Sequence, residues 1–451
     1  MSEYKIKRGY DIPMIGAAER VVEDAERPGI VSIRPTEFRA VKPKIDVKDG
    51  DKVQVGQTLF HDRKRPEIRF PSPGGGEILE VRYGRRRRCE EIFIKLDSDE
   101  SAVEHRAYSP DDARGLNRAQ IVEALLDSGL WACLRQRPYS VIPDPESVPD
   151  AVFIAASDSG PLPFDASLAL DGREEDFQLG IDLLAKLTEG KVHLCLAKRG
   201  APARAFAEAT GCEKHTFTGP YPSGLIETQI HYVMPHKKGR KVWYLDCQDV
   251  AAVGELFRTG RYPVARVVAV GGEGAESRKH FRTRRGVSVD FLLRGNSHPA
   301  RNRFVSGGVL TGVSVSSESA LGFYDSKFCV FPEGDDPEFI GWMKPGFGKV
   351  SRFRAYASAL LPPRSPHLTA NLGGGVRAHV ATGIYEDVCA VDILPGYLMK
   401  AVLAGDFEEM DALGIHDCAE CGLCTFVCPS KIEFGEIMAQ GIDEFLREEE
   451  G

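Results

Sequence analysis

The sequence predicts a multi-domain α/β protein in which a small, strand-rich domain precedes a doubly wound parallel sheet. Three observations lead to this prediction. The chain has 451 residues, which at about 150 residues per domain corresponds to roughly three domains. Short strands separated by glycines dominate residues 39–96, and strand-like runs alternate with helical stripes over residues 117–259.

The composition is that of a packed globular protein. Hydrophobic residues make up 42% and charged residues 27% of the chain, which is unlike a disordered or fibrous sequence. The net charge of −8 argues against a general nucleic-acid-binding protein, because such proteins carry an excess of basic residues. We therefore expect no nucleic acid among the partners.

The apolar runs are too short to cross a membrane. Runs such as residues 264–270 and 388–394 fall far short of the roughly 18 apolar residues that a membrane-spanning helix needs. The N-terminus, MSEYKIKRG, has no apolar signal core. We therefore expect a cytoplasmic protein.

Residues 39–96 are predicted to fold as short strands and tight turns. Gly50 and Gly56 follow alternating apolar positions, and the Gly74–Gly76 triplet opens a second, similar half. Glycine supplies the positive φ that such turns require. Two similar halves of this length resemble, in fold, the barrel-sandwich hybrid of biotinyl and lipoyl carrier domains.

Two basic features of this first domain have alternative interpretations. Lys64 lies near the place of a carrier lysine, but no modification motif surrounds it, so we expect a solvated turn. The run Arg85–Arg88 is a local basic patch in an acidic protein. Such a patch suits docking to an acidic partner or to anionic lipid headgroups, and a solvated turn is the alternative.

Residues 117–259 are predicted to form a doubly wound sheet. Apolar stripes at residues 121–126 and 177–187 have helical spacing, and the runs 152–156, 192–197 and 242–245 suit strands buried on both faces. Alternating strands and helices favour a parallel sheet with right-handed crossovers.

This predicted sheet lacks a dinucleotide loop. Ligands of such sheets bind at the carboxyl ends of the strands, where glycines let the backbone approach a pyrophosphate. After the strand at 152–156, Gly160 is followed by Pro161, which has no backbone N–H to donate. The stretch Gly271–Gly274 contains a glutamate and has no sixth-position glycine. Short strands are predicted again over residues 261–317, and a helix begins within residues 392–406.

The eleven cysteines divide into two groups. Seven stand singly in apolar or strand-like contexts and are expected to be reduced core residues: Cys89, Cys133, Cys195, Cys212, Cys247, Cys329 and Cys389. The other four, Cys418, Cys421, Cys424 and Cys428 before Pro429, follow the spacing of bacterial ferredoxins. This spacing favours an iron-sulfur cluster over zinc and predicts a [4Fe-4S] site on these four thiols. A metal-free remnant of such a site is the alternative.

The sequence does not determine which residue would be the fourth ligand of the cluster. In two-cluster ferredoxins the cysteine before proline ligates the other cubane, and the sequence has no second cysteine triplet. The fourth ligand could be Cys428 after rearrangement, a distant thiol such as Cys389, or a group from a neighbouring subunit. His416 is a further candidate, although we expect it to be exposed to solvent.

Several motifs in order resemble one family. They are FPSPGGGEILEV, SDSGPLPFD, GPYPSGLIETQIHYV, VWYLDCQDVAAVGELFRTG, NRFVSGGVLTG and CTFVCPSKIEFG. Over nearly its full length the chain resembles the NqrA family, the A subunits of sodium-translocating NADH:quinone reductases. The resemblance implies four parts: a barrel-sandwich hybrid domain (1–100), a Rossmann-like domain (101–259), a β-grasp module of the SLBB kind (260–330) and a C-terminal domain with a helical, ferredoxin-like cysteine segment (331–451).

The resemblance also implies a function. It suggests a peripheral component on the cytoplasmic face of a six-subunit translocase that moves electrons from NADH to ubiquinone and exports sodium. The partners would be subunits B to F, with ubiquinone as substrate of the complex and neither FMN nor NAD bound by this chain. Family members keep CTFVCP but lack the two upstream cysteines. A related alternative is therefore an electron relay like the C subunit of the Rnf complex, and a purely structural docking role is another.

Two polar residues lie in a stretch that matches the family. Tyr221 in GPYPSG and His231 in IETQIHYV could line a pocket, although hydrogen bonding within the core is the expected use. The resemblance transfers no catalytic residue and no quinone ligand to this chain.

Overall fold

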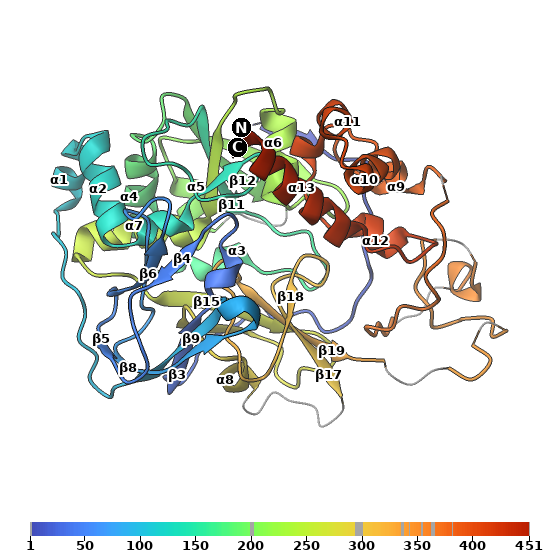
Figure 1. Ribbon diagram of the computed structural model, residues 1–451, viewed down its shortest axis with the longest axis horizontal. Helices are drawn as coiled ribbons and strands as arrows, with labels where there is room; N and C mark the ends of the chain where they lie inside the picture. Colours follow the sequence, from blue (N-terminus) through green and yellow to red (C-terminus); the bar gives the residue numbers. More distant parts are fainter. Residues whose placement is uncertain are drawn as a thin grey trace.

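The computed structural model describes residues 2–198, 203–293, 301–334, 338–341, 343–352, 355–361, 366–380 and 382–450. Within these residues the strands form four sheets. Helices of the C-terminal part lie against the α/β domain (Figure 1). The predicted fold class, a multi-domain α/β protein that begins with a barrel-sandwich hybrid, is confirmed.

The barrel-sandwich domain consists of two small sheets, with strand orders β3-β9-β8-β5 and β4-β6-β7. Phe60 and Phe70 stack at its centre with their ring centroids 4.4 Å apart, and Phe38 packs against both. The strands are β3 (Ile30–Ile33), β4 (Pro43–Ile45), β5 (Lys52–Val53), β6 (Thr58–Asp62), β7 (Arg69–Pro71), β8 (Gly76–Tyr83) and β9 (Cys89–Leu96). Short 3-10 turns lie at η1 (Pro35–Glu37) and η2 (Arg85–Arg87).

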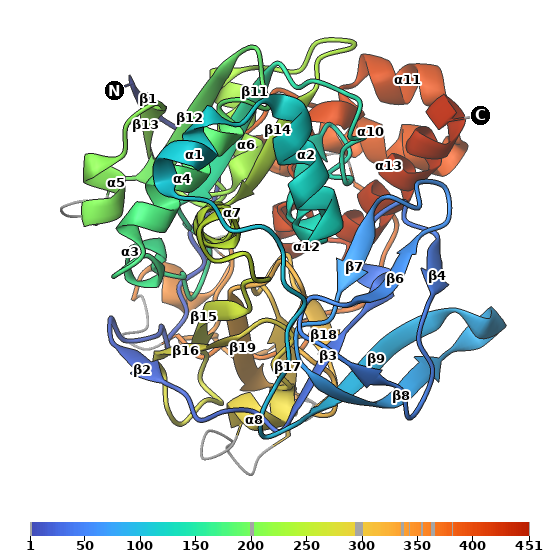
Figure 2. The ribbon, with the colours of Figure 1, turned by 90° about the vertical axis from the view of Figure 1, so that its left-hand side faces the viewer.

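Both basic features of this domain lie in exposed turns. Lys64 is exposed between β6 and β7, and all four residues of Arg85–Arg88 are exposed at the tip of the β8–β9 hairpin. Arg86 and Arg87 have φ of +57°, a conformation that side chains other than glycine adopt rarely. The hairpin extends from the body of the domain (Figure 2).

The α/β domain contains a sheet of order β1-β13-β12-β11-β14-β10, parallel except for the β10 edge. Its strands are β1 (Ser2–Lys5), β10 (Arg135–Arg137), β11 (Ala151–Ala156), β12 (Lys191–Ala197), β13 (Glu213–Thr218) and β14 (Val242–Asp246). Its helices are α1 (Pro110–Gly115), α2 (Arg118–Asp127), η3 (Leu130–Cys133), α3 (Ala166–Ala169), α4 (Glu174–Leu184), α5 (Arg204–Glu208), α6 (Ile226–Val233) and α7 (Cys247–Thr259).

Alternate residues of the central strand face opposite sides of this sheet. Val152 and Ile154 belong to the core that includes α4 and α7, whereas Phe153 packs with Ile226 and Ile230 of α6. Successive side chains of a strand point to opposite faces, so helices cover both. This arrangement agrees with the doubly wound sheet predicted from the sequence.

The first strands of the chain complete sheets that are built mainly from later residues. Strand β1 pairs in parallel with β13, and β2 (Val22–Asp24) pairs in parallel with β16 (His280–Arg284). The sheets of the barrel-sandwich domain therefore begin only at β3. Both strands are short and largely exposed, so they carry no strong hydrophobic pattern from which their pairing could be predicted.

A third domain is built on a mixed sheet of order β18-β17-β19-β15-β16-β2. Its further elements are β15 (Ala265–Gly271), α8 (Val289–Leu293), β17 (Asn302–Ser306), β18 (Val313–Val315) and β19 (Lys327–Pro332). Short strands predominate in this segment, as the sequence predicts, and residues 289–293 form the short helix α8 between them. Val289, Leu292 and Leu293 are buried, and their i, i+3, i+4 spacing suits one face of a helix.

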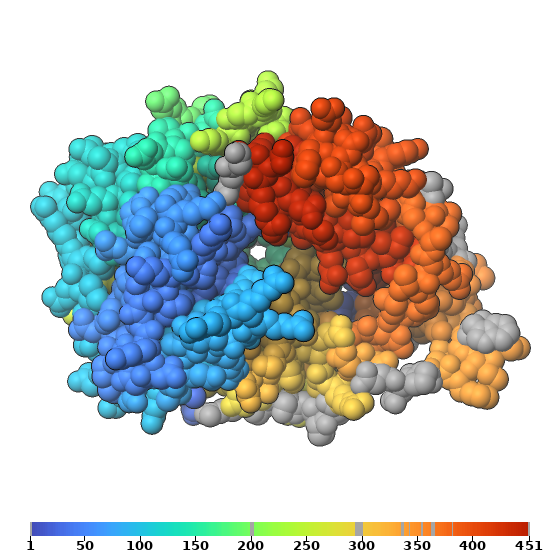
Figure 3. Space-filling view, viewed as in Figure 1, coloured from blue at the N-terminus to red at the C-terminus, as the bar shows by residue number. Residues whose placement is uncertain are grey.

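The C-terminal part is mainly helical. Its elements are η4 (Ala357–Ala359), α9 (Ile384–Val388), α10 (Pro395–Ala404), α11 (Phe407–Ala412), η5 (Ile415–Asp417), α12 (Leu423–Val427) and α13 (Phe434–Glu450). Helix α10 begins with Pro395 and ends at Gly405 in the left-handed conformation, which are common start and stop residues of helices. Figure 3 shows these helices beside both the α/β domain and the barrel-sandwich domain.

Candidate metal centre

The cysteine-rich loop lies between η5 and α12. Cys418 directly follows η5, Cys424 is on α12, and Cys428 ends α12. The loop turns through left-handed conformations at Glu420, with φ of +48°, and at Gly422, with φ of +75°. A Cβ on Gly422 would lie 2.5 Å from the Leu310 carbonyl oxygen. Glycine is therefore required where the loop packs against the third domain.

Four cysteines line one cavity. Among the described residues, its lining includes Cys389, Cys418, Cys421 and Cys424, around a space of about 40 Å³. Cys389 comes from the end of α9, far from the others in sequence. Most of the remaining wall is apolar, including Val391 of the α9–α10 connection. The fold therefore places Cys389, which stands alone in the sequence, at the same cavity as the three cysteines of the loop.

Burial makes these thiols hard to ionise without a cation. It raises the pKa of Cys421 to about 11 and that of Cys389 to about 12. Burial also raises the pKa of Cys418 and Cys424, and thiols on the same cavity raise it further. At neutral pH the metal-free site therefore holds four neutral thiols.

Backbone N–H groups oppose the effect of burial at three of these thiols. The amides of Val391, Glu420 and Leu423 lower the pKa of Cys389, Cys418 and Cys421, although burial outweighs them. In each case the donor lies two residues after the cysteine. Such bonds stabilise the thiolate form and tune the potential of iron-sulfur centres.

This donor set fits an iron-sulfur cluster. Four cysteine thiolates are the usual ligands of a [4Fe-4S] cubane, and soft thiolates select iron-sulfur clusters or zinc over hard cations. Because ligands must be deprotonated, metal binding would release the thiol protons that burial retains. The apolar wall and the N–H donors would limit water and stabilise charge on sulfur.

Cys428 lies outside this group. Its sulfur is buried, 3.2 Å from the Tyr385 hydroxyl oxygen, and the Ile432 N–H donates to it at 3.4 Å. Cys428 is not among the described residues that line the cavity. The structure therefore brings three of the four predicted ligands together and places the fourth elsewhere.

His416 differs from expectation. The sequence predicts an exposed side chain, but His416 is only 8% exposed. Its Nε2 lies 3.0 Å from an Asp411 carboxylate oxygen, and the ring contacts Tyr139, His236 and Phe445. The expectation is wrong because α11 and α13 enclose the ring, and its interaction with Asp411 directs it away from the thiols.

Tyr221 and His231 both contact the cysteine loop. The Tyr221 hydroxyl donates to the Cys421 carbonyl oxygen at 2.6 Å, and His231 Nδ1 lies 3.2 Å from an Asp417 carboxylate oxygen. Burial raises the pKa of Tyr221 far above its ordinary value, so the hydroxyl remains a donor at neutral pH. The Tyr221 hydrogen bond and the His231–Asp417 contact thus hold the loop against the α/β domain.

Sequence reasoning missed a second anchor of the loop. Arg137, at the β10 edge of the sheet, donates to the carbonyl oxygens of His416 at 2.6 Å and Cys418 at 3.1 Å. The side chain is buried. No local motif marks Arg137, because its partners are almost three hundred residues away.

The carboxyl ends of β11, β12 and β13 line a separate polar cavity of about 120 Å³. The Asp158 carboxylate accepts the N–H groups of Gly160 and Phe164 at 2.8 and 2.9 Å. It also pairs with the Lys327 ammonium group at 2.7 Å. At the position where related sheets bind phosphate, this chain therefore presents a carboxylate.

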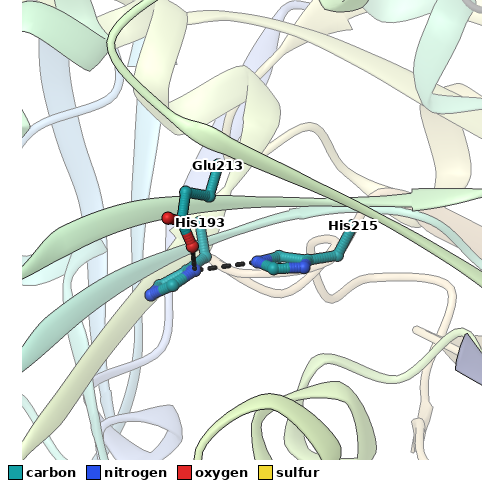
Figure 4. A group of neighbouring side chains, drawn as sticks. All are labelled: His193, Glu213 and His215. Atoms are coloured by element: carbon teal, nitrogen blue, oxygen red, sulfur yellow. Dashed lines mark hydrogen bonds and ion pairs between the residues drawn. The ribbon is translucent and has the colours of Figure 1, made fainter. Parts of the chain in front are cut away.

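A third group of polar side chains lies on β12 and β13, comprising His193, Glu213 and His215 (Figure 4). Their potential ligand atoms lie within 4.8 Å of one another. His193 Nδ1 is 2.8 Å from His215 Nε2, so the two rings share a hydrogen bond, and Lys191 pairs with Glu213. These interactions occupy the atoms that a cation would need.

We expect His193 to make the fold sensitive to acid. Burial, assisted by His215, lowers the pKa of His193 from 6.5 to about 4. The unfolded chain therefore binds this proton at higher pH, so stability is complete above about pH 6.5 and is lost as the pH falls towards 4. His193→Phe, which keeps a ring stacked on Phe153, should reduce this loss by roughly 1–3 kcal/mol.

Urea unfolding between pH 7 and pH 4 measures this difference. The control is His367→Phe, because the His367 side chain is 63% exposed. A His193→Phe protein whose stability fell with pH as steeply as that of wild type would contradict the assignment.

Comparison with known proteins places the fold in a class. Three family models match the chain: the NqrA N-terminal barrel-sandwich hybrid domain at residues 4–97, the NqrA second alpha/beta domain at 116–262 and the NQRA C-terminal domain at 267–317. The order of these domains defines a multi-domain protein of the NqrA class. The cysteine-rich loop lies after the third matched range.

Full-length relatives identify the family. The chain is 37% identical to the Na(+)-translocating NADH-quinone reductase A subunit of Hahella chejuensis over 98% of this chain and 99% of that protein. It is 34% identical to the Rhodopirellula baltica protein of the same name (98% of each chain) and 37% identical to that of Pseudomonas aeruginosa strain UCBPP-PA14 (98% of this chain and 99% of that protein). The chain belongs to the NqrA family, the A subunits of Na(+)-translocating NADH-quinone reductases.

Proposed function

We propose that this chain works in the ubiquinone-reducing half of a sodium-pumping NADH:ubiquinone oxidoreductase, without an NADH or flavin site of its own. It would be a peripheral component on the cytoplasmic face, held there by subunits B to F. The family supports membership in the complex, since its relatives are named as subunits of a Na(+)-translocating NADH-quinone reductase. No helix among the described residues has both the length and the apolar character needed to span a bilayer.

The carboxyl edge of the α/β sheet supports the proposal that nucleotides are bound elsewhere in the complex. A phosphate at this edge would meet the Asp158 carboxylate, whose backbone and Lys327 partners are already in place. Burial alone would raise the pKa of Asp158, but Lys327 and the two amides outweigh it and hold the pKa below its ordinary value. The group is therefore anionic at neutral pH, and it occupies the two amides and the ammonium group that a phosphate would otherwise bind.

Exposed apolar side chains support attachment through partner subunits. In the part of residues 338–361 that the structure describes, Phe339 is 83%, Met343 66%, Leu360 86% and Leu361 67% exposed. Exposed apolar side chains in such number are common at protein interaction sites. The exposed run Arg85–Arg88 offers a second, basic contact to an acidic partner or headgroup.

Binding measurements on the purified chain test this function. We expect saturable binding of a short-chain ubiquinone and no binding of NADH or FMN in the same titration. Saturable NADH or FMN binding would contradict the proposal. If ubiquinone does not bind but deletion of the gene prevents assembly of the complex, the chain has a structural docking role instead.

The four-thiol cavity favours a second function, that of an electron relay. A [4Fe-4S] cluster, when bound, supplies one-electron transfer. Cys418, Cys421 and Cys424 would hold it together with a fourth thiolate, while the apolar wall excludes water and the Glu420 and Leu423 amides hydrogen-bond to sulfur. We expect about four irons per chain after anaerobic purification or reconstitution. A chain without iron after reconstitution would be a metal-free remnant.

A further inference from the structure

We propose that Cys389, and not Cys428, is the fourth ligand of the cluster. The ligand set is then Cys389, Cys418, Cys421 and Cys424. This inference rests on the second proposed function, since it concerns how the chain would hold the group. It replaces the ligand set that the cysteine spacing alone predicts.

The first argument is the common cavity. Cys389 lines the same apolar space as the three loop cysteines, and it lies at the end of α9, where the chain leaves the helix. Cys389 therefore borders the same space as the three cysteines of the loop.

The second argument is the position of the segment that carries Cys389. Its neighbours Val388, Ala390 and Val391 line the same cavity. The backbone on both sides of Cys389 therefore borders the space between this segment and the cysteine loop.

The third argument is the environment of Cys428. Its sulfur interacts with the Tyr385 hydroxyl and the Ile432 N–H, and its own N–H donates to the Thr425 carbonyl oxygen at 3.3 Å. Turning this sulfur into the cavity would break its contacts with Tyr385 and Ile432. Cys389 requires no such rearrangement.

Ferredoxin chemistry explains why Cys389 can take this place. In the run that ends in Cys-Pro, that last cysteine ligates the neighbouring cubane, so each triplet obtains its fourth thiolate from outside its own run. In this chain the triplet Cys418, Cys421 and Cys424 likewise needs a thiolate from elsewhere, and the fold supplies Cys389. Cys428, the cysteine before proline, then remains without a cluster.

Matched alanine variants test the assignment on the full chain. Wild type, Cys389→Ala, Cys428→Ala and Cys421→Ala are reconstituted anaerobically with iron and sulfide. Cys247→Ala serves as the control for loss of a buried thiol, because Cys247 is on α7. The readouts are iron and acid-labile sulfide per chain, visible absorbance, and EPR after reduction with dithionite, with circular dichroism to confirm folding.

We expect Cys428→Ala and Cys247→Ala to keep about four irons and the EPR signal of wild type. Cys389→Ala and Cys421→Ala should lose iron and the wild-type signal. Loss of the signal in folded Cys428→Ala, or its retention in Cys389→Ala, would overturn the assignment. If Cys389→Ala fails to fold, Cys428→Ala still tests whether Cys428 is a ligand, and Cys389→Ser, which keeps the size of the side chain, tests Cys389. A wild-type protein without iron would instead defeat the electron-relay function itself, and this inference with it.

Discussion

An Asp249→Ala variant should lose about 3–5 kcal/mol of unfolding free energy, the usual cost of removing one partner of a buried ion pair. Asp249 lies on α7 and is buried. One of its carboxylate oxygens is 2.7 Å from an Arg266 nitrogen and 2.5 Å from an Arg285 nitrogen. Alanine would leave two buried guanidinium groups without their shared counter-charge.

This network joins the α/β domain to the third domain. Arg266 is on β15 and Arg285 follows β16, while Gln248 of α7 exchanges hydrogen bonds with the backbone of Val267. Burial alone would raise the pKa of Asp249, but Arg266 and Arg285 outweigh it and keep the pKa below its ordinary value. The carboxylate is thus charged at neutral pH, and its loss should affect both domains.

Urea unfolding at neutral pH, followed by circular dichroism, measures this effect. Asp249→Asn should fall between wild type and Asp249→Ala, because the amide can still accept one hydrogen bond. The control is Asp111→Ala, since the Asp111 side chain is 97% exposed, and its effect should stay within about 0.5 kcal/mol. An Asp249→Ala protein as stable as this control would show that the network adds nothing to stability.

An Arg39→Ala variant should release the C-terminal helices from the barrel-sandwich domain, at a cost of about 2–4 kcal/mol to their local stability. Arg39 donates two parallel bonds to the Glu420 carboxylate at 2.9 and 2.7 Å. Its Nε lies 3.1 Å from an Asp443 carboxylate oxygen on α13. Since Glu420 is in the cysteine loop, the same change should weaken retention of iron.

The pH dependence of this effect follows from Glu420. Burial alone would raise the pKa of Glu420, but Arg39 outweighs it and lowers the pKa below 4.5. The stabilisation is therefore complete above about pH 4.5 and is lost as the pH falls through the lower, folded-state pKa. The difference between wild type and Arg39→Ala should disappear in acid.

Hydrogen exchange of α12 and α13 measures this release. Arg39→Lys is the matched control, because lysine keeps the charge but cannot form the bidentate fork, so it should show an intermediate increase in exchange. Exchange should stay unchanged in β8 and β9, which Arg39 does not join to the loop. Equal protection of α13 in wild type and Arg39→Ala would exclude this clamp.

The elements with strong local patterns were predictable from the sequence. Strands β11, β12 and β14 are continuous apolar runs, and α4 and α10 carry clear apolar stripes with recognisable ends. Local sequence also explains where the secondary structure departs from the main pattern of a segment. Residues 289–293 form a short helix inside a strand-rich segment, because an apolar run of this length can suit either a helix or a strand.

The sequence by itself determined the family, the two first domains and the triplet Cys418, Cys421 and Cys424. These features depend on periodicity and residue spacing over short stretches of sequence. Local steric constraints and hydrogen bonds convert such patterns directly into structure. Only the tertiary structure decided that β1 joins β13, that Arg137 holds the cysteine loop, and that Cys389 rather than Cys428 lines the thiol cavity. Such contacts join residues that are distant in the sequence and depend on how the sheets and helices pack. No local sequence pattern therefore predicts which of these elements come into contact.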